Sequence, residues 1–203
     1  MIAVIDYGVG NLFSLKSSLD YLGLENKLVS TVDEIEKADK IILPGVGAFS
    51  DAAKKLKESG LEDAVKKAAE DGKALLGICL GMQLLFEKSY EYGEHVGLSL
   101  IKGEICPLSA DIDESLKVPH IGWNSLNIQK PSDPLMKYVK NGDYVYYVHS
   151  FYAKNCRESI VASSSYGVEV PGTVRNKNVW GCQFHPEKSG EVGLSILKAF
   201  GEI

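Results

Sequence analysis

The segment at residues 74–86 constrains the fold of this chain most strongly, because one cysteine lies where an apolar strand becomes a helix. Cys79 stands between Gly77 and Gly81, which is the spacing of a nucleophile elbow. Glycine suits both positions, since a Cβ atom there would crowd the sharp turn and the packing of helix on strand. We therefore expect the thiol at the end of a strand, facing the first backbone N–H groups of a helix that begins near Leu80.

Two interpretations of Cys79 follow from this segment. A helix N-terminus favours thiolate over thiol, so a cysteine whose free pKa is about 8.5 can become a nucleophile near neutral pH. Cysteine is also one of the most often buried residue types, and a buried cysteine acts only as a small apolar side chain. The segment alone does not separate a reactive thiol from a buried one.

The first half of the chain alternates short β-rich runs with helical patterns, which is typical of a parallel sheet covered by helices. Strands are expected at residues 2–6, 28–30, 40–43 and 74–78. Helices are expected up to residue 22, with Asn11 as the N-cap, and over residues 49–70, with an interruption at residues 59–60. The elbow would then lie at the carboxyl end of a parallel strand, where open α/β sheets bind their ligands.

After about Tyr92 the pattern changes to short β-rich segments of mixed or antiparallel character. They lie at residues 118–121, 125–128, 144–148, 160–165, 172–175 and 179–184. A closing helix is expected at residues 190–200. The predicted fold is a single α/β domain over residues 1–203, with a flavodoxin-like open, largely parallel sheet flanked by helices and additional antiparallel strands in the C-terminal half.

Composition narrows the class of protein. The net charge of −5 and the lack of a Lys/Arg-rich block argue against a nucleic-acid partner, and no apolar run is long enough to span a membrane. The chain enters a strand directly, without a signal-peptide pattern, and its four cysteines form neither a C-x-x-C pair nor a zinc spacing. We expect a cytoplasmic protein with reduced thiols, no metal and no organic cofactor.

A thiol nucleophile needs a base that takes its proton and a third group that orients the base. The predicted strand at residues 179–184 leads into His185, Pro186 ends its hydrogen-bonding ladder, and Glu187 follows. If the ends of two strands are neighbours in the sheet, one imidazole nitrogen can face Cys79 while the other meets Glu187. Taken alone, this tripeptide also fits a surface turn.

A third segment offers backbone donors. A buried-looking strand ends in Pro-Gly-Val-Gly at residues 44–47 and leads into a helix. Acyl transfer needs N–H groups directed at the developing oxyanion, and glycines let the backbone approach closely. We expect a backbone N–H of Val46 or Gly47, together with that of Leu80, to form an oxyanion hole. By itself this turn also fits an ordinary loop between a strand and a helix.

These motifs together resemble those of the class I (triad) glutamine amidotransferases. The resemblance rests on three motifs: Pro-Gly-Val-Gly at 44–47, Gly-Ile-Cys-Leu-Gly-Met-Gln at 77–83 and His-Pro-Glu at 185–187. Within that family the chain resembles the glutaminase subunits of imidazole glycerol phosphate synthase, through Ile-Asp-Tyr-Gly-Val-Gly-Asn-Leu at 5–12, Ala-Phe at 48–49 and Pro-His-Ile-Gly-Trp-Asn at 119–124. The resemblance covers essentially the full length.

The resemblance implies that the chain hydrolyses L-glutamine to glutamate and ammonia with the triad Cys79, His185 and Glu187. It also implies a substrate site that includes Gln83, one helical turn beyond the cysteine. A solvated helix glutamine is the alternative for Gln83. Backbone groups of the segment His149, Ser150 and Phe151 would hold the amino-acid end of the substrate, and the imidazole of His149 would be structural.

The resemblance further implies a heterodimer with a (β/α)8-barrel cyclase, or synthase, subunit. That partner would receive the ammonia through an internal passage and make imidazole glycerol phosphate and an aminoimidazole carboxamide ribotide. Asn11, His120 and Trp123 are the expected interface residues, although Asn11 also fits a helix cap and Trp123 also fits the core. The isolated chain would be nearly inactive until the partner binds its own ligand and the turn at residues 44–47 rearranges.

Other functions stay open on the sequence. The chain could be a triad amidotransferase subunit for anthranilate, guanylate, carbamoyl phosphate or pyridoxal phosphate synthesis, although the turn at 44–49 and the segment at 119–124 favour the imidazole glycerol phosphate enzyme. A stand-alone thiol hydrolase or peptidase could use the same sheet. In a non-enzymatic redox or regulatory module, Cys79 would only be oxidised.

Overall fold

The computed structural model, which describes residues 1–203, is built around an eight-stranded sheet with the strand order β2-β1-β3-β4-β14-β13-β12-β9. Its parallel half consists of β1 (Ile2–Ile5), β2 (Asn26–Val29), β3 (Lys40–Leu43), β4 (Ala74–Ile78) and β14 (Val179–Cys182). Its antiparallel end consists of β13 (Val168–Asn176), β12 (Ile160–Tyr166) and β9 (Asn127–Ile128). The predicted α/β fold, largely parallel with antiparallel strands in the C-terminal half, is confirmed.

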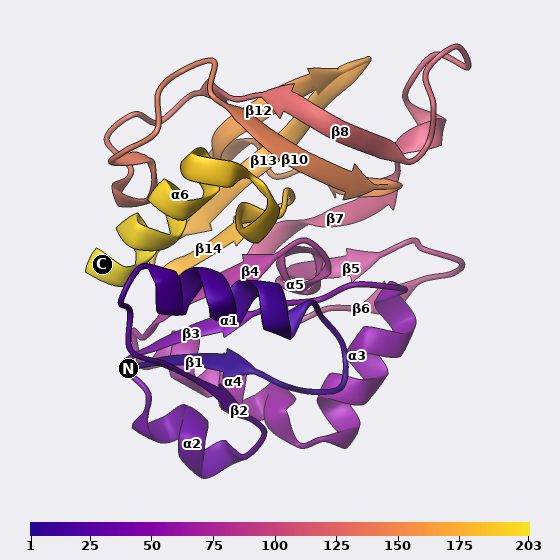
Figure 1. The fold of residues 1–203 in the computed structure, drawn as a ribbon. Coiled ribbons are helices and arrows are strands. Elements are labelled where there is room, and N and C mark those ends of the chain that lie inside the picture. Colours follow the sequence, from indigo (N-terminus) through magenta and orange to yellow (C-terminus); the bar gives the residue numbers. More distant parts are fainter.

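Helices cover both faces of this sheet (Figure 1). One face carries α1 (Leu12–Tyr21) and α6 (Gly190–Glu202), and the other carries α2 (Val32–Lys37), α3 (Phe49–Glu58), α4 (Leu61–Glu70) and α5 (Leu80–Leu84). Side chains alternate across a strand, so Ile2 and Val4 of β1 pack with α1 while Ala3 and Ile5 pack into the opposite core. None of the helices combines the length and the apolar character that a membrane span requires.

Two smaller sheets extend the C-terminal half. One has the order β11-β7-β5-β6 and the other pairs β10 with β8. Their bounds are β5 (Phe86–Ser89), β6 (His95–Val96), β7 (Ile101–Pro107), β8 (His120–Ser125), β10 (Tyr144–His149) and β11 (Phe151–Lys154). Short 3-10 turns are η1 (Leu108–Ala110), η2 (Pro134–Met136), η3 (Arg157–Ser159) and η4 (Pro186–Lys188). Strand β10 ends at His149 and strand β11 begins at Phe151, so the segment around Ser150 is held between these two strands.

Several element boundaries differ from the sequence expectations. The helical stretch after residue 49 divides at Gly60, whose φ of +74° lies in the left-handed region that favours glycine. Strand β8 begins at His120 rather than at residue 118, since Pro119 has no N–H for a ladder. The expected strand at 125–128 is divided, because Ser125 ends β8 while β9 joins the large sheet.

Five helices and strands were missed: α2, β5, β6, β7 and β11. Strand β5 has the sequence Phe-Glu-Lys-Ser and buries only its two end residues. Because two charged residues are adjacent at its centre, it lacks the alternation of apolar and polar residues that predicts a strand. Strand β7 alternates buried and partly exposed residues, but Lys102 and Gly103 weaken its β-rich character. Both strands are fixed by their pairing with each other rather than by local propensity.

Candidate active site

Cys79 occupies a strained turn between β4 and α5. Its φ of 54° and ψ of −111° are unusual for a residue with a side chain. Two backbone hydrogen bonds hold this turn: the Cys79 N–H donates to the Cys182 carbonyl at 2.7 Å, and the Gln83 N–H donates to the Cys79 carbonyl at 3.1 Å. The thiol is consequently fixed at the carboxyl end of the parallel strands.

Glycines make this turn sterically feasible. A Cβ atom on Gly81 would overlap the backbone carbonyl oxygen of Leu43, and one on Gly77 would lie 2.7 Å from the Gly81 carbonyl oxygen. A Cβ on Gly45 would approach the Gly81 nitrogen to 2.9 Å. The close backbone approach expected from the sequence is therefore present around the elbow.

We expect Gly81→Ala to lower the free energy of unfolding by about 3–5 kcal/mol, because α5 must move away from β3 to admit the methyl group. Urea unfolding measures this change. Gly60→Ala is the control without crowding: the φ of Gly60 is positive but nothing lies within 4 Å of the added Cβ, so only the backbone cost of about 1–2 kcal/mol remains. Equal losses in the two variants would contradict close packing at the elbow.

His185 and Glu187 meet Cys79 because β14 and β4 are parallel neighbours. The register pairs Cys182 with Ile78, so the chain leaves both strands at the same edge of the sheet. His185 Nδ1 lies 2.8 Å from Glu187 Oε1, and each of these side chains is only 3% exposed. The sequence analysis required the two strand ends to be neighbours before His185 could face Cys79, and this register places them side by side.

The pKa of His185 reflects two opposing effects. Burial lowers this pKa, but the hydrogen bonds with Cys79 and Glu187 and the negative charges of these groups outweigh burial and raise it to about 10. His185 is therefore an imidazolium at neutral pH, held between a sulfur and a carboxylate. An imidazolium at this place can donate a proton to a leaving group that departs beside the sulfur.

A cavity of about 420 Å³ opens in front of the thiol. Its walls include nine residues that the sequence analysis singled out: Val46, Gly47, Cys79, Leu80, Gln83, His149, Ser150, Phe151 and His185. Glu187 lies behind His185 and is not part of the wall. Segments from four distant parts of the chain thus meet in one space beside the nucleophile, and this space is large enough for a small amino acid.

Gln83 is a buried wall residue and not a solvated helix residue. Its side-chain nitrogen donates hydrogen bonds to the Phe151 carbonyl and to Gln183 Oε1, each at 3.1 Å. The Gln183 amide nitrogen in turn lies 4.0 Å from the Cys79 sulfur. The position of Gln83 is therefore fixed relative to both the thiol and the far wall of the cavity.

The expected oxyanion hole is not assembled in this structure. The Leu80 N–H donates a hydrogen bond to the Gly45 carbonyl at 3.3 Å, so one expected donor is engaged by the turn itself. Tyr7 holds the same turn, since its hydroxyl donates to the Pro44 carbonyl at 2.8 Å. Helix α5 has only five residues, which also makes its contribution to the field at the thiol smaller than a long helix would give.

Sequence comparison assigns the family. Residues 3–202 match the family described as glutamine amidotransferase class-I. The chain belongs to this family. It is 50% identical to the imidazole glycerol phosphate synthase subunit HisH of Caldanaerobacter subterraneus subsp. tengcongensis, with 100% of this chain and 98% of the relative covered. It is also 50% identical to the subunit of the same name from Listeria monocytogenes, with 100% and 96% covered.

Solved structures agree on the fold. A crystal structure of a glutamine amidotransferase superposes with a TM-score of 0.76 at 22% identity, covering 99% of this chain and 100% of that one. At this identity the likeness speaks for the fold alone. The class-I amidotransferase fold is therefore shared by chains whose sequences have diverged widely.

The sequence analysis missed Glu91, a carboxylate in the cavity wall. Burial raises its pKa, while its hydrogen bond with the backbone of Phe49 acts in the opposite direction. In that bond the Phe49 N–H donates to Glu91 Oε2 at 2.6 Å. Glu91 follows β5 in a polar loop that belongs to none of the motifs, so only the folding of this loop over α3 reveals it.

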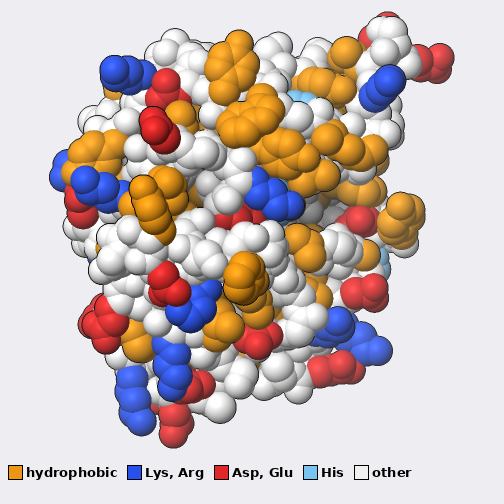
Figure 2. All heavy atoms as spheres, in the orientation of Figure 1, with side chains coloured by type: hydrophobic (Ala, Val, Ile, Leu, Met, Phe, Trp, Pro, Cys, Tyr) orange, Lys and Arg blue, Asp and Glu red, His pale blue; other side chains and the backbone are white.

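The three expected interface residues lie in different environments. Trp123 is 55% exposed and Ile121 is 58% exposed, and both face outward from β8, where Figure 2 shows hydrophobic side chains gathering over β8 and β10. His120 is only 3% exposed because alternate residues of this strand point inward. Asn11 is half-buried and caps α1, its side-chain oxygen accepting from the Ser14 N–H at 3.4 Å.

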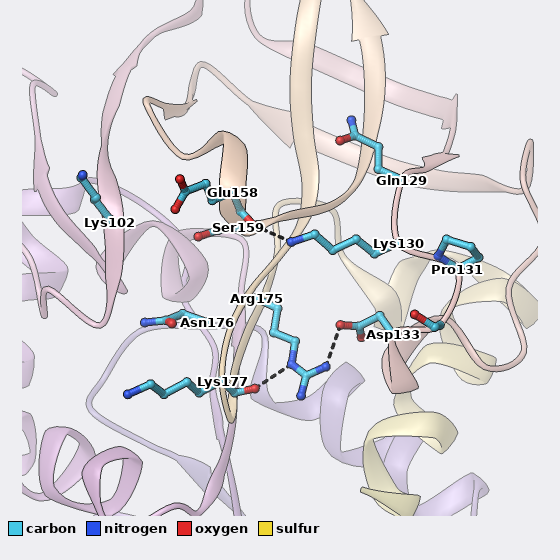
Figure 3. A pocket seen from close by; sticks show the side chains of 11 residues that line it. Lys102, Gln129, Lys130, Pro131, Asp133, Glu158, Ser159, Arg175, Asn176 and Lys177 are labelled. Carbon is cyan, nitrogen blue, oxygen red and sulfur yellow. Dashed lines mark hydrogen bonds and ion pairs between the residues drawn. The ribbon is translucent and has the colours of Figure 1, made fainter.

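A larger hollow of about 660 Å³ lies elsewhere, at the turn between β13 and β14 (Figure 3). Three of its charged side chains are engaged by protein: Arg175 pairs with Asp133 at 3.1 Å, and Lys130 donates to the Glu158 carbonyl. Its wall contains neither a cysteine nor a histidine. The turn precedes β14 and His185 follows it, so this hollow lies at the opposite end of the strand from the thiol.

Proposed function

We propose that this chain is the glutaminase subunit of an imidazole glycerol phosphate synthase and releases ammonia from L-glutamine for a cyclase subunit. The observation that carries the proposal is the strained Cys79, which shares one cavity with the His185 imidazole that is bonded to Glu187. Relatives named as HisH subunits of this synthase, which match the chain over its whole length, support the choice of pathway. Residues 1–203 would form one domain that acts in the cytoplasm.

The chemistry proceeds through a glutamyl thioester. The Cys79 thiolate attacks the side-chain amide carbon of glutamine, and the His185 imidazolium donates a proton to the departing ammonia. The same imidazole, now neutral, takes a proton from a water molecule that attacks the thioester. Glutamate and the thiolate–imidazolium pair result, and the Glu187 carboxylate stabilises the positive ring in both halves of the reaction.

The cavity wall supplies complementary groups for the amino-acid end of glutamine. Glu91 places a negative charge there, which suits the substrate ammonium group. Elsewhere in the cavity wall, the side chain of Gln83 and the backbone of Ser150 and Phe151 offer amide groups to the substrate. These groups lie far from the scissile amide in the substrate, so we propose that they bind and orient it.

Glu91→Gln is expected to raise KM for glutamine about tenfold and to change kcat little, because the lost charge pair is made in both ground and transition states. The amide oxygen can still accept from the Phe49 N–H, which preserves the fold. Steady-state kinetics check this result. Glu87→Gln is a matched control, since Glu87 also accepts a backbone N–H, that of Gly103, but lies outside the cavity wall; equal KM values in the two variants would argue against the assignment.

We further propose that rearrangement of the turn at residues 44–47 activates the enzyme. The bond from Leu80 N–H to Gly45 must break before Leu80 and Val46 or Gly47 can donate to an oxyanion. Val46 is exposed at the cavity mouth, where a docked partner would reach it. The chain alone would then hydrolyse glutamine slowly, and the partner with its own ligand would accelerate the reaction.

The partner is proposed to be a (β/α)8-barrel cyclase that forms a heterodimer with this chain. Exposed apolar side chains support a docking surface: Ile121, Trp123 and Tyr144 on β8 and β10, and Tyr92 at the cavity mouth. A subunit that covers this surface would receive ammonia directly from the cavity. Asn11 lies on the first turn after β1 and would border the same contact.

A reconstituted reaction tests the proposed function. The chain is mixed with a candidate cyclase subunit, glutamine and the phosphoribulosyl nucleotide intermediate, and glutamate and imidazole glycerol phosphate are measured together. We expect both products in equal amounts. Glutamate without imidazole glycerol phosphate would assign the chain to another amidotransferase pathway, and hydrolysis of esters or peptides by the chain alone would assign a stand-alone hydrolase.

A further inference from the structure

Two buried histidines outside the triad form a hydrogen-bonded chain that ends at the cavity wall. Strands β8 and β10 pair with His120 opposite His149, and His120 Nδ1 lies 2.9 Å from His149 Nε2. The other end of each ring is also bonded: His120 Nε2 lies 3.3 Å from Asn124 Nδ2, and His149 Nδ1 lies 2.9 Å from the Phe151 carbonyl oxygen. His149 lines the cavity, whereas His120 lies behind it.

Only one arrangement of protons satisfies these contacts when both rings are neutral. The Phe151 carbonyl accepts only, so His149 Nδ1 carries a proton and His149 Nε2 is an acceptor. His120 Nδ1 must then donate to it, which leaves His120 Nε2 to accept from the Asn124 amide group. Each ring is therefore held in one tautomer by its neighbour.

The surroundings keep both rings neutral and fixed in orientation. His120 is stacked on Tyr166 at 4.0 Å and on Tyr147 at 4.7 Å between ring centroids. Burial lowers the pKa of His120 to about 4 and, together with the neighbouring His120, lowers that of His149 to about 3. Protonation of either ring would place two N–H donors face to face, so the neutral state and the chain of bonds require each other.

We infer that His120 is a positioning residue for glutamine binding, acting through His149 on the Phe151 carbonyl and Gln83. That carbonyl accepts from both His149 Nδ1 and Gln83 Nε2. Without the His120 donor, the His149 ring can adopt the other tautomer and lose its bond to Phe151. The inference rests on the proposed function, because the wall that it positions is the proposed glutamine site.

Kinetics of the chain in complex with its cyclase subunit test this role with His120→Phe, which keeps an aromatic ring between the tyrosines and removes both hydrogen bonds. We expect KM for glutamine to rise about tenfold, the effect of one lost hydrogen bond at a buried acceptor, with kcat nearly unchanged. The rate of alkylation of Cys79 by iodoacetamide should stay the same, since the triad is untouched. An unchanged KM would overturn the inference.

Two further variants separate positioning from a general packing role. His120→Asn should restore most of the affinity, because its amide nitrogen is as many bonds from Cβ as His Nδ1 and can donate to His149. Tyr166→Phe keeps the stacked ring, loses only its bond to the Lys117 carbonyl, and should behave like the wild type. A His120→Asn variant as impaired as His120→Phe would overturn the inference.

Nitrogen NMR of the unmodified chain at neutral pH gives a test that needs no variant and no activity. We expect His120 and His149 both to be neutral with the proton on Nδ1. A proton on Nε2 of His149 would overturn the inference even if glutamine hydrolysis is confirmed. Conversely, a wild-type complex that does not hydrolyse glutamine would overturn the proposed function while leaving the tautomers as found.

Discussion

Replacing Cys79 with alanine is expected to reduce glutamine hydrolysis by about four orders of magnitude or more, since no other group can form the thioester. The fold should persist, because the alanine methyl group occupies the same strained turn as the cysteine Cβ. Production of glutamate by the complex with the cyclase subunit measures the effect.

An ammonium salt distinguishes loss of chemistry from loss of structure. The Cys79→Ala complex should still make imidazole glycerol phosphate when ammonia is supplied directly, because the variant lacks only the source of ammonia. Cys106→Ala is the matched control, since Cys106 is a free cysteine on β7 outside the cavity wall and should retain full activity. Glutamine-dependent turnover by Cys79→Ala would favour the redox or regulatory interpretation of this cysteine.

Glu187→Gln is expected to lower kcat by at least about a hundredfold, because the imidazolium formed between Cys79 and Glu187 loses its charged partner. The amide can also present its NH₂ group to His185 Nδ1, which would favour the wrong tautomer. The substitution keeps the size and shape of the side chain. Glu191→Gln, an exposed residue in the first turn of α6, serves as control and should leave kcat unchanged.

The pH dependence of the same variant has a defined sign. In the wild type, contacts with Cys79 and Glu187 outweigh burial and hold the pKa of His185 near 10, so the proton donor for the leaving ammonia is present at neutral pH and lost as pH rises through that value. Without the carboxylate this pKa falls, and the alkaline limb of the kcat profile should move to lower pH. An alkaline limb that stays in place would mean that Glu187 does not stabilise the imidazolium.

Much of the site follows from local sequence because its chemistry depends on short-range backbone geometry. A strained nucleophile turn requires small neighbours, so Gly77 and Gly81 mark Cys79 without knowledge of the fold. Pro186 begins the 3-10 turn η4 shortly after β14 ends at Cys182, and it marks His185 near the edge of the sheet. Whether the ends of these two strands are neighbours stayed open on the sequence, and the pairing of β14 with β4 in the structure meets that condition.

The remaining features depend on contacts between distant segments, which local patterns do not encode. The engagement of Leu80 by Gly45 depends on how closely the turn at 44–47 packs on α5. Glu91 reaches the cavity only because its loop folds over α3. The bond between His120 and His149 requires the antiparallel register of β8 and β10. The sequence motif suggested that His120 lies at a partner interface, whereas this register buries its side chain.

Covalent labelling of the chain in its complex with the cyclase subunit tests the central claim most directly. A diazoketone analogue of glutamine binds in the substrate site, where its diazo carbon takes a proton from His185 and the Cys79 thiolate then displaces nitrogen gas, which leaves the label as a stable thioether. Mass spectrometry of the resulting peptides should find one adduct, on Cys79, and added glutamine should slow its formation. An adduct on Cys106, Cys156 or Cys182, or hydrolysis of glutamine that continues after Cys79 is fully labelled, would contradict the account.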